Sequence, residues 1–246
     1  MDRLIYTAMS GASAAAQRQA VLANNLANAS TQGFRAELSA FRAVPLRGEG
    51  ATTRVFTVEA TTGHDSRAGS IERTGRDLDL AAQGQAWFAV QGLDGTEAYT
   101  RGGAFQVSSE GTLVNSAGLV VLSDGGAPID VPQGAQIAIG TDGTVTSKTD
   151  GQPGATLGRI KLATEDAENR LQRGEDGLFR TATQEPLAAD ATARVESGAL
   201  EGSNVNPVEA MVGMIAAARQ FDQQMRLLQN TETADKAASQ LLSVQG

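Results

Sequence analysis

The sequence of 246 residues contains no cysteine and a single histidine, His64. Disulfide bridges, thiolate nucleophiles and thiolate metal ligands are therefore excluded. A Ser-His-Asp triad would have to be built around His64. Because His64 lies in a stretch rich in Gly, Asp and Ser, residues 62–66, we interpret it as a solvated loop residue. We expect no catalytic site, no cofactor and no metal site, and hence no enzyme.

Positive charge, aromatic residues and proline are also scarce. Lys and Arg number 20 against 28 Asp and Glu, which gives a net charge of −8 without any basic cluster. Nucleic acid and anionic membrane surfaces are therefore poor partners. Aromatic residues make up only 4%, and there are 6 prolines against 28 glycines. Such a chain is rich in tight turns, and part of its apolar surface is expected to be buried against other chains.

Long apolar runs are absent as well. No stretch approaches the roughly 20 apolar residues that a membrane span needs, so we expect no direct membrane insertion. Residues 4–9 could be taken for the apolar part of a secretory signal, with alanines at 14–16 as its cleavage site. That run is short and is interrupted by Thr7, and Asp2 offsets the charge of Arg3. We therefore expect no cleaved signal peptide.

The first residues that carry a strong pattern predict a helix over 3–28. Apolar and small residues recur there in alternating steps of three and four, which is the spacing of a coiled-coil seam. The row consists of Ile5, Ala8, Ala12, Ala15, Gln19, Leu22 and Leu26. Its many alanines permit close helix approach but bury little area, so the helix is expected to need partners.

The segment ANNLANASTQGF, residues 23–34, predicts the end of this helix. Short amide side chains at Asn24, Asn25 and Asn28 compete for backbone hydrogen bonds and favour termination. Gly33 can adopt a positive φ, and Phe34 supplies a large apolar group just beyond the helix. The polar rim around Leu26 is suited to a surface on which other chains pack.

Residues 35–76 lack a strong period and read as an extended linker with one or two strands. From 77 to 198, short apolar runs are separated by Asp-Gly pairs at 94, 124, 142, 150 and 176. Asp-Gly between apolar runs is a hairpin signal, so we predict an antiparallel β domain. The Asp-Gly pairs lack the alternating acidic ligands and closing Glu of an EF-hand, which makes calcium loops the weaker alternative.

A second helix is predicted from Pro207 onward. Asn206 is a good N-cap, Pro207 suits the first helical position, and Glu209 follows three residues after the cap. A second seam then runs through Met211, Met214, Ala218, Phe221, Met225 and Leu228. The predicted class is α+β, with long terminal helices forming a coiled-coil layer and a central antiparallel β domain. The expected segments are 1–34, 35–76, 77–198 and 199–246.

Three strings, in this order along the chain, resemble signatures of the bacterial flagellar rod and hook protein family. Residues 1–9 with ANNLANASTQGF resemble its N-terminal signature, and SGALEGSNVNPVEAM (197–211) resembles its C-terminal one. RDLDLAAQGQAWFAVQ (76–91) and EAYTRGGAFQVSSEGTLVNSAG (97–118) are similar to its central β region. The signature positions are Asn24, Asn25, Leu26, Asn28, Gly33, Phe34, Asn204, Asn206 and Pro207.

The resemblance implies an axial structural subunit of the flagellar basal body. Residues 34–48 and Pro207 favour a proximal-rod member, with a distal-rod or hook-type subunit as the alternative. It further implies export by the flagellar type III apparatus, assembly with other proximal and distal rod proteins, and a place in the rod within the periplasm. Subunit packing would then use the two seams, Ile5, Ala8, Ala12, Ala15, Leu22 and Leu26 with Met211, Met214, Ala218, Phe221, Met225 and Leu228. A secreted β-domain enzyme is the competing class.

Overall fold

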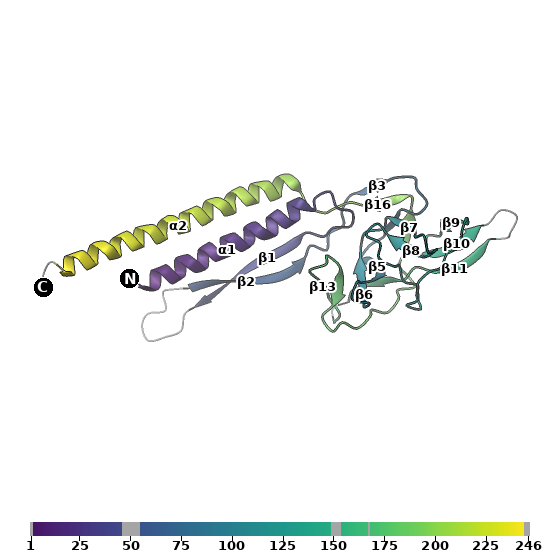
Figure 1. The fold of residues 1–246 in the computed structure, drawn as a ribbon, viewed down its shortest axis with the longest axis horizontal. Helices are drawn as coiled ribbons and strands as arrows, with labels where there is room; N and C mark the ends of the chain where they lie inside the picture. Colours follow the sequence, from purple (N-terminus) through teal and green to yellow (C-terminus); the bar gives the residue numbers. More distant parts are fainter. Residues whose placement is uncertain (1, 46–54, 149–153, 167, 244–246) are drawn as a thin grey trace. The chain divides into compact units, whose positions relative to one another are not determined.

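The computed structural model describes residues 2–45, 55–148, 154–166 and 168–243. Within these ranges the chain forms one long helix near each end and sixteen strands between them (Figure 1). It divides into two compact units. A helix unit contains residues 1–27, 37–63 and 205–246, and a β unit contains residues 28–36 and 64–204.

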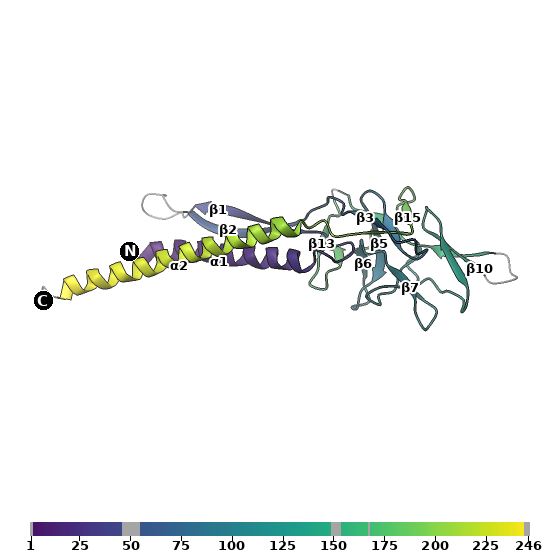
Figure 2. The same cartoon turned by 90° about the horizontal axis from the view of Figure 1, so that it is seen from above.

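In the helix unit, α1 (Asp2–Ala27) and α2 (Pro207–Ser243) lie side by side in both views (Figures 1 and 2). Two close contacts show that they run antiparallel. Gly213 faces Leu22, and Gly11 faces Gln224, each so closely that an added Cβ would lie 3.0 Å from the opposing side chain. Strands β1 (Glu37–Pro45) and β2 (Val55–His64) pair with each other, and β1 packs against α1.

The structure corrects the expected fold class. We predicted an α+β chain with a coiled-coil layer, but the described part of the chain is predominantly β, with only two helices. The physical reason is visible at α1, which packs against α2 on one side and against β1 on another. A helix that shares its surface between a helix and a strand is not part of a helical layer. The prediction of a coiled-coil layer is therefore wrong.

The β unit consists of small antiparallel sheets. A five-stranded sheet has the order β12-β5-β6-β14-β13, a three-stranded sheet has the order β11-β10-β9, and the pairs β15-β4, β16-β3 and β7-β8 complete the unit. The strands are β3 (Ile71–Arg73), β4 (Leu80–Ala82), β5 (Ala86–Gln91), β6 (Glu97–Thr100), β7 (Phe105–Val107), β8 (Leu113–Asn115), β9 (Gln136–Ile139), β10 (Thr144–Lys148), β11 (Ala155–Arg159), β12 (Leu162–Thr164), β13 (Leu171–Arg173), β14 (Phe179–Thr181), β15 (Val195–Ser197) and β16 (Ala199–Glu201).

Turn chemistry and core packing explain this unit. The Asp-Gly pairs at 94, 142 and 176 join β5 to β6, β9 to β10 and β13 to β14, as predicted, and the pair at 150 lies outside the described residues. Two apolar clusters fill the interior, one around Phe88 and Phe105 and the other around Trp87 and Tyr99. Large aromatic side chains dominate the burial of such cores.

Candidate assembly surfaces and signature contacts

The signature asparagine Asn25 attaches α1 to the beginning of β1. Its Nδ2 donates to the carbonyl of Glu37 at 3.0 Å, and its Oδ1 accepts from the Glu37 N–H at 2.8 Å. The side-chain amide thus acts like one residue of a paired strand. Because Asn25 is buried, both of its polar ends need these partners. Asn24 is exposed, and Leu26 is half-buried.

Gly33 and Phe34 lie inside the β unit. Gly33 has a φ of +69°, and its N–H donates to the carbonyl of Glu201 at 2.8 Å. A Cβ at this position would lie 2.3 Å from backbone atoms of Arg101 and Gly102, so the site accepts only glycine. Phe34 is buried, with the Arg173 guanidinium 4.3 Å from its ring centroid.

Asn204 holds three chain segments together. Its Oδ1 accepts from the N–H of Ala36 at 2.7 Å, while its Nδ2 donates to the carbonyls of Asp65 and Arg67, each at 2.9 Å. Its own N–H donates to the carbonyl of Phe34 at 3.2 Å. The C-terminal signature residue therefore stabilises the chain that follows the N-terminal signature.

The remaining signature positions mark helix and turn boundaries. Asn206 caps α2, because its Oδ1 accepts from the N–H groups of Val208 at 3.1 Å and Glu209 at 3.3 Å. Pro207 is the first residue of α2, as predicted. Asn28 follows α1 and accepts from the Thr31 hydroxyl at 3.2 Å.

A buried ion cluster joins the same strings, and sequence reasoning missed it. Arg35, Arg101 and Glu201 are all 2% exposed. Arg35 Nη1 lies 2.5 Å from one carboxylate oxygen of Glu201, and Arg101 Nη2 lies 2.6 Å from the other. Arg101 also donates to the carbonyls of Ala82 and Ala86. Burial lowers the pKa of the Arg101 guanidinium, and the neighbouring Glu201 carboxylate acts against that shift.

The environment of His64 differs from the predicted solvated loop. His64 ends β2, and its imidazole lies 4.8 Å from the Phe179 ring and 5.6 Å from the Trp87 ring. Its Nε2 is buried and has no hydrogen-bond partner among the described residues. Burial lowers the pKa of His64 below 6.5, and the Glu165 carboxylate partly opposes this shift. The interpretation of His64 as a solvated residue is therefore wrong.

The predicted packing row of α1 is covered within the chain, and its member Leu22 contacts Gly213 of α2. Ala8, Ala12 and Ala15 are buried, and the larger members of the row are half-buried: Ile5, Leu22 and Leu26. Alanine and glycine at the contact allow the close approach seen at Gly11 and Gly213. The predicted contact of this row with neighbouring subunits stays a prediction.

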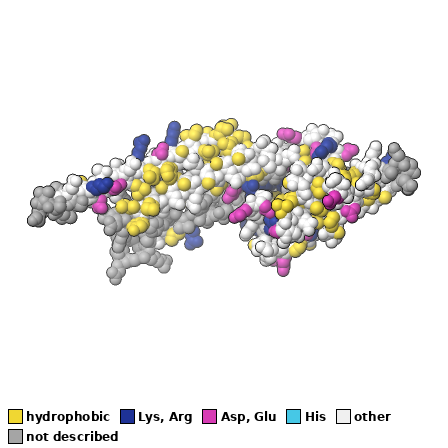
Figure 3. Space-filling model, viewed as in Figure 1, with side chains coloured by type: hydrophobic (Ala, Val, Ile, Leu, Met, Phe, Trp, Pro, Cys, Tyr) yellow, Lys and Arg dark blue, Asp and Glu magenta, His cyan; other side chains and the backbone are white. Residues whose placement is uncertain are grey.

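The predicted row of α2 is only partly turned toward α1. Its members Met214, Ala218, Phe221 and Leu228 are half-buried, whereas Met211 is 51% and Met225 is 37% exposed. In place of the two exposed methionines, the covered face contains Ala210, Ala217 and Gln224. The face of α2 that is covered is thus rotated about the helix axis from the predicted apolar face. Met211 is therefore exposed to solvent. Hydrophobic side chains are accordingly visible over the helices in Figure 3.

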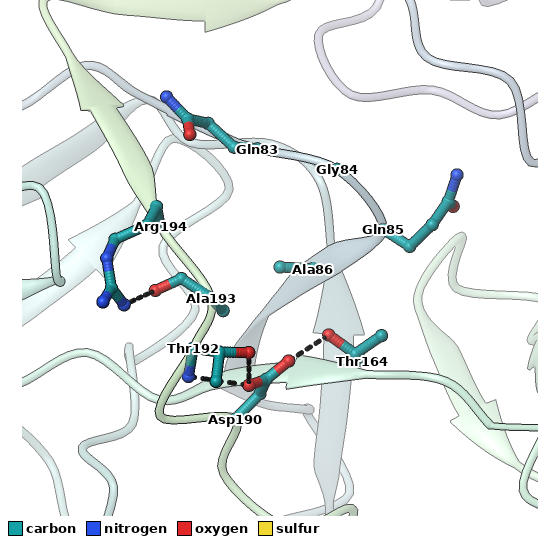
Figure 4. Close-up of a pocket in the computed structure, with 9 residues that line it drawn as sticks. All are labelled: Gln83, Gly84, Gln85, Ala86, Thr164, Asp190, Thr192, Ala193 and Arg194. Carbon is teal, nitrogen blue, oxygen red and sulfur yellow. Dashed lines mark hydrogen bonds between the residues drawn. The ribbon is translucent and has the colours of Figure 1, made fainter.

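Several residues that line a polar surface pocket in the β unit form hydrogen bonds with one another (Figure 4). Asp190 accepts from the Thr192 hydroxyl at 2.6 Å and from the Thr164 hydroxyl at 2.8 Å. These bonds hold the pKa of Asp190 at about 2, so the carboxyl group is not a proton donor near neutral pH. Arg194 Nη1 donates to the carbonyl of Ala193 at 2.8 Å. The geometry is that of a turn rather than of a catalytic site.

The described part of the chain holds neither a cluster of metal ligands nor a membrane-spanning helix. No group of three or more acidic or histidine residues there is arranged to hold a metal ion. Neither helix is long and apolar enough over its described residues to cross a membrane.

Three segments of the chain match known families of flagellar proteins. Residues 5–35 match the family described as flagella basal body rod protein, residues 81–147 match the flagellar hook protein FlgE/F/G D1 domain, and residues 196–241 match the flagellar basal body rod FlgEFG protein C-terminal family. The chain is 46% identical to the flagellar basal-body rod protein FlgF of Salmonella typhimurium, over 99% of this chain and 100% of the relative.

Other relatives give the same result. The FlgF protein of Escherichia coli is 47% identical over the same shares of both chains. The FlgG protein of Bacillus subtilis is 31% identical over 99% of each chain. The resemblance to the flagellar rod and hook protein family is confirmed. The chain therefore belongs to the family of flagellar basal-body rod proteins and, within it, to the FlgF group.

Proposed function

We propose that this chain is a structural subunit of the proximal flagellar rod, which transmits torque along the flagellar axis. The observation that carries the proposal is the similarity to FlgF proteins over 99% of the chain. The arrangement of polar groups agrees with a structural role, because signature asparagines are used as internal hydrogen-bond partners. Asn25 and Asn204 are examples. The function requires assembly with other rod components rather than catalysis.

The finer parts of the proposal concern the route and the place of assembly. We infer that the chain is exported by the flagellar type III apparatus without signal cleavage and joins the rod in the periplasm. The absence of cysteine agrees with this route, since a chain without thiols forms no disulfide before or during export. A distal-rod or hook-type position is the alternative within the family.

Complementation tests the proposed function. In a strain that lacks this gene, we expect loss of motility, and the reintroduced full-length chain should restore swimming. The chain should co-purify with basal bodies, with its N-terminal residues retained. Immunogold labelling should locate it at the cytoplasmic-membrane end of the rod. Label at the distal rod or hook would favour the alternative, and absence from basal bodies would reject the structural role.

A further inference from the structure

The described part of the chain contains several Asp-Gly pairs, each in a tight turn of the β unit. The pairs begin at Asp94, Asp124, Asp142 and Asp176. In such a pair the backbone nitrogen of glycine can attack the aspartate side chain, because glycine carries no side chain that would shield it. The product is a five-membered succinimide ring, which opens to aspartate or to isoaspartate. The turn around each pair controls whether its two reacting groups are free to meet.

In three of the pairs, a hydrogen bond holds the nitrogen that would attack. The glycine N–H donates to the carbonyl three residues back, from Gly95 to Gly92 at 2.9 Å, from Gly143 to Gly140 at 2.9 Å and from Gly177 to Gly174 at 3.1 Å. Aspartate is thus the third residue of its turn and glycine is the fourth. The attack would have to break the hydrogen bond that closes the turn.

The carboxylates of the same three pairs are held as well. Each accepts a hydrogen bond from the backbone N–H two residues further on. The donors are Thr96 at 3.0 Å, Thr144 at 3.1 Å and Leu178 at 3.1 Å. Side-chain hydrogen bonds from the hydroxyl groups of Thr96 and Thr144 and from the Arg180 guanidinium lower the pKa of these carboxyl groups. A lower pKa leaves less of the neutral acid, which is the form that loses its hydroxyl group in the reaction.

The turn at Asp124 is offset by one residue from the other three. Here the N–H of Gly126 donates to the carbonyl of Ser123 at 2.7 Å, so Asp124 and Gly125 are the second and third residues of the turn. The N–H of Gly125 has no hydrogen-bond partner among the described residues. Within the same residues, the Asp124 carboxylate contacts only Arg159, at a long 3.5 Å. Both reacting groups are therefore free, and both residues are exposed.

We propose that Asp124-Gly125 is a site of spontaneous isoaspartate formation, and that the turns protect the other three pairs. In the first step the Gly125 nitrogen bonds to Cγ of the neutral Asp124 carboxyl group. The hydroxyl group of that carboxyl leaves together with the proton of the nitrogen, as water. Water then adds to one of the two carbonyl carbons of the ring. Cleavage of the bond from nitrogen to Cγ restores aspartate, whereas cleavage of the bond from nitrogen to the main-chain carbonyl carbon leaves isoaspartate.

Isoaspartate at this position would lengthen the backbone where the turn is attached to the neighbouring strand. The N–H of Asp124 donates to the carbonyl of Arg159, the last residue of β11, at 3.0 Å. Just beyond β11, the N–H of Lys161 donates to the carbonyl of Leu122 at 2.9 Å. The additional main-chain carbon follows directly after these contacts and disturbs the closure of the turn.

Ageing of the purified full-length chain at neutral pH tests the site. Endoproteinase Asp-N cleaves before aspartate but not before isoaspartate, so mass spectrometry of its peptides reports each pair separately. Isoaspartate at 124 replaces the peptides 94–123 and 124–129 with a single peptide, 94–129. We expect this peptide to accumulate over weeks relative to the fresh sample. Modification of the three protected pairs should be at least about tenfold lower, the factor that corresponds to one hydrogen bond to a charged group.

Two variants change the selectivity in opposite directions. In Gly125→Ala, the added Cβ would lie 3.9 Å from the Ser123 hydroxyl oxygen, so the turn accommodates it, while the methyl group shields the nitrogen. We expect modification at Asp124 to fall to the level of the protected pairs. Thr144→Val keeps the side-chain shape but removes the hydroxyl that donates to Asp142 at 2.7 Å. It should raise modification at Asp142 severalfold and leave that at Asp124 unchanged.

Ageing in guanidinium chloride provides the control without turns, and there the four pairs should be modified alike. A preference for Asp124 that persisted in the unfolded chain would show that the neighbouring sequence selects the site, and would overturn the inference. So would absence of modification at Asp124 in the folded chain, equal modification of the four pairs, or an unchanged rate in Gly125→Ala. Because the isolated chain is measured, none of these results depends on rod assembly or on the proposed function.

Discussion

At Gly33, a single residue satisfies two backbone requirements at once. Its φ of +69° lies in the left-handed region, and its Cα faces the peptide between Arg101 and Gly102. Other glycines with positive φ, such as Gly84 with +63°, face open space instead. A comparison of Gly33 with Gly84 therefore separates the free-energy cost of the left-handed conformation from that of the close backbone contact.

We expect Gly33→Ala to destabilise the β unit more than Gly84→Ala does. The left-handed conformation costs an alanine about 1–2 kcal/mol at either position. Only Gly33→Ala also forces apart two backbone segments. Urea unfolding followed by the fluorescence of Trp87, the single tryptophan, measures the difference. Equal losses of stability in the two variants would contradict the close packing at Gly33.

His64 predicts a dependence of stability on pH. Its folded-state pKa is lowered below 6.5 by burial, so the unfolded chain binds a proton at a pH where the folded chain does not. The stability that neutral His64 contributes is thus fully present above about pH 6.5 and is lost as the pH falls toward the folded-state pKa.

The comparison is between wild type and His64→Phe, which keeps an aromatic ring beside Trp87 and Phe179. We expect the urea midpoint of the wild type to fall between about pH 7.5 and pH 5.5 by more than that of the variant. Arg35, Asp65 and Glu165 act on His64 in both directions, so their charges are kept unchanged. Parallel pH profiles would show that His64 does not titrate differently on unfolding.

At the scale of elements, the Arg35–Glu201–Arg101 cluster connects the chain after Phe34, the end of β6 and the end of β16. One carboxylate serves two guanidinium groups, and Glu201 Oε1 also accepts from the N–H of Gly69 at 2.9 Å. Removing one member of a buried ion group leaves the others without compensation.

We expect Glu201→Gln to reduce the free energy of unfolding by about 3–5 kcal/mol, because two buried arginines lose their counter-charge. Glu196→Gln is the matched control, since Glu196 pairs with the exposed Arg73 at 3.2 Å. A surface pair contributes about 0–1 kcal/mol, so the control should unfold almost as the wild type does. Similar losses in both variants would show that the cluster is compensated by other groups.

The helix pair allows an equally direct comparison at neighbouring positions. Ala217 is 1% exposed, whereas Ala216 is exposed. Glutamate at 217 would bury a charge without a partner between the helices. We expect Ala217→Glu to lower the thermal midpoint of the helical circular-dichroism signal, and Ala216→Glu to leave it nearly unchanged. The reverse order would place the contact between the helices on the face of α2 that includes Ala216 rather than on the one that includes Ala217.

At the scale of the whole molecule, the two units differ in how their interiors are filled. The β unit buries Trp87, Phe88, Tyr99 and Phe105, while the described contact between the helices relies on alanine and half-buried residues. Burial of large apolar side chains contributes about 1.5–3 kcal/mol each, and alanine contributes far less. The helix unit is therefore the less stable of the two in an isolated chain.

Limited trypsin digestion should reveal this difference. We expect early cleavage after the exposed Arg18, Arg219 and Arg226, and protection of the buried Arg35 and Arg101. N-terminal sequencing and intact mass of the fragments identify the sites. Resistance of the full-length chain at low concentration would show that the helices are held as firmly as the β unit.

Local features of the sequence determined the elements and the family. The start of α2 at Asn206 and Pro207 follows from helix capping, which involves only four consecutive residues. The turns at 94, 142 and 176 follow from the backbone preferences of the two residues of each Asp-Gly pair. The signature strings pointed to the rod proteins because each is a short run of residues that can be recognised without knowing its partners in the fold. Each of these inferences depends on residues close together in the chain.

Only the tertiary structure decided which distant residues meet. Spacing predicted a helical row through Met211, but the close contact at Gly213 turns Ala210 and Ala217 toward α1 instead. Glu201 pairs with Arg35, which is 166 positions away in the sequence, and with Arg101, which is 100 positions away. No local sequence pattern predicts either ion pair. Helical periodicity gives the spacing of a face but not its partner, and a buried charge is stable only where folding brings the opposite charge to it.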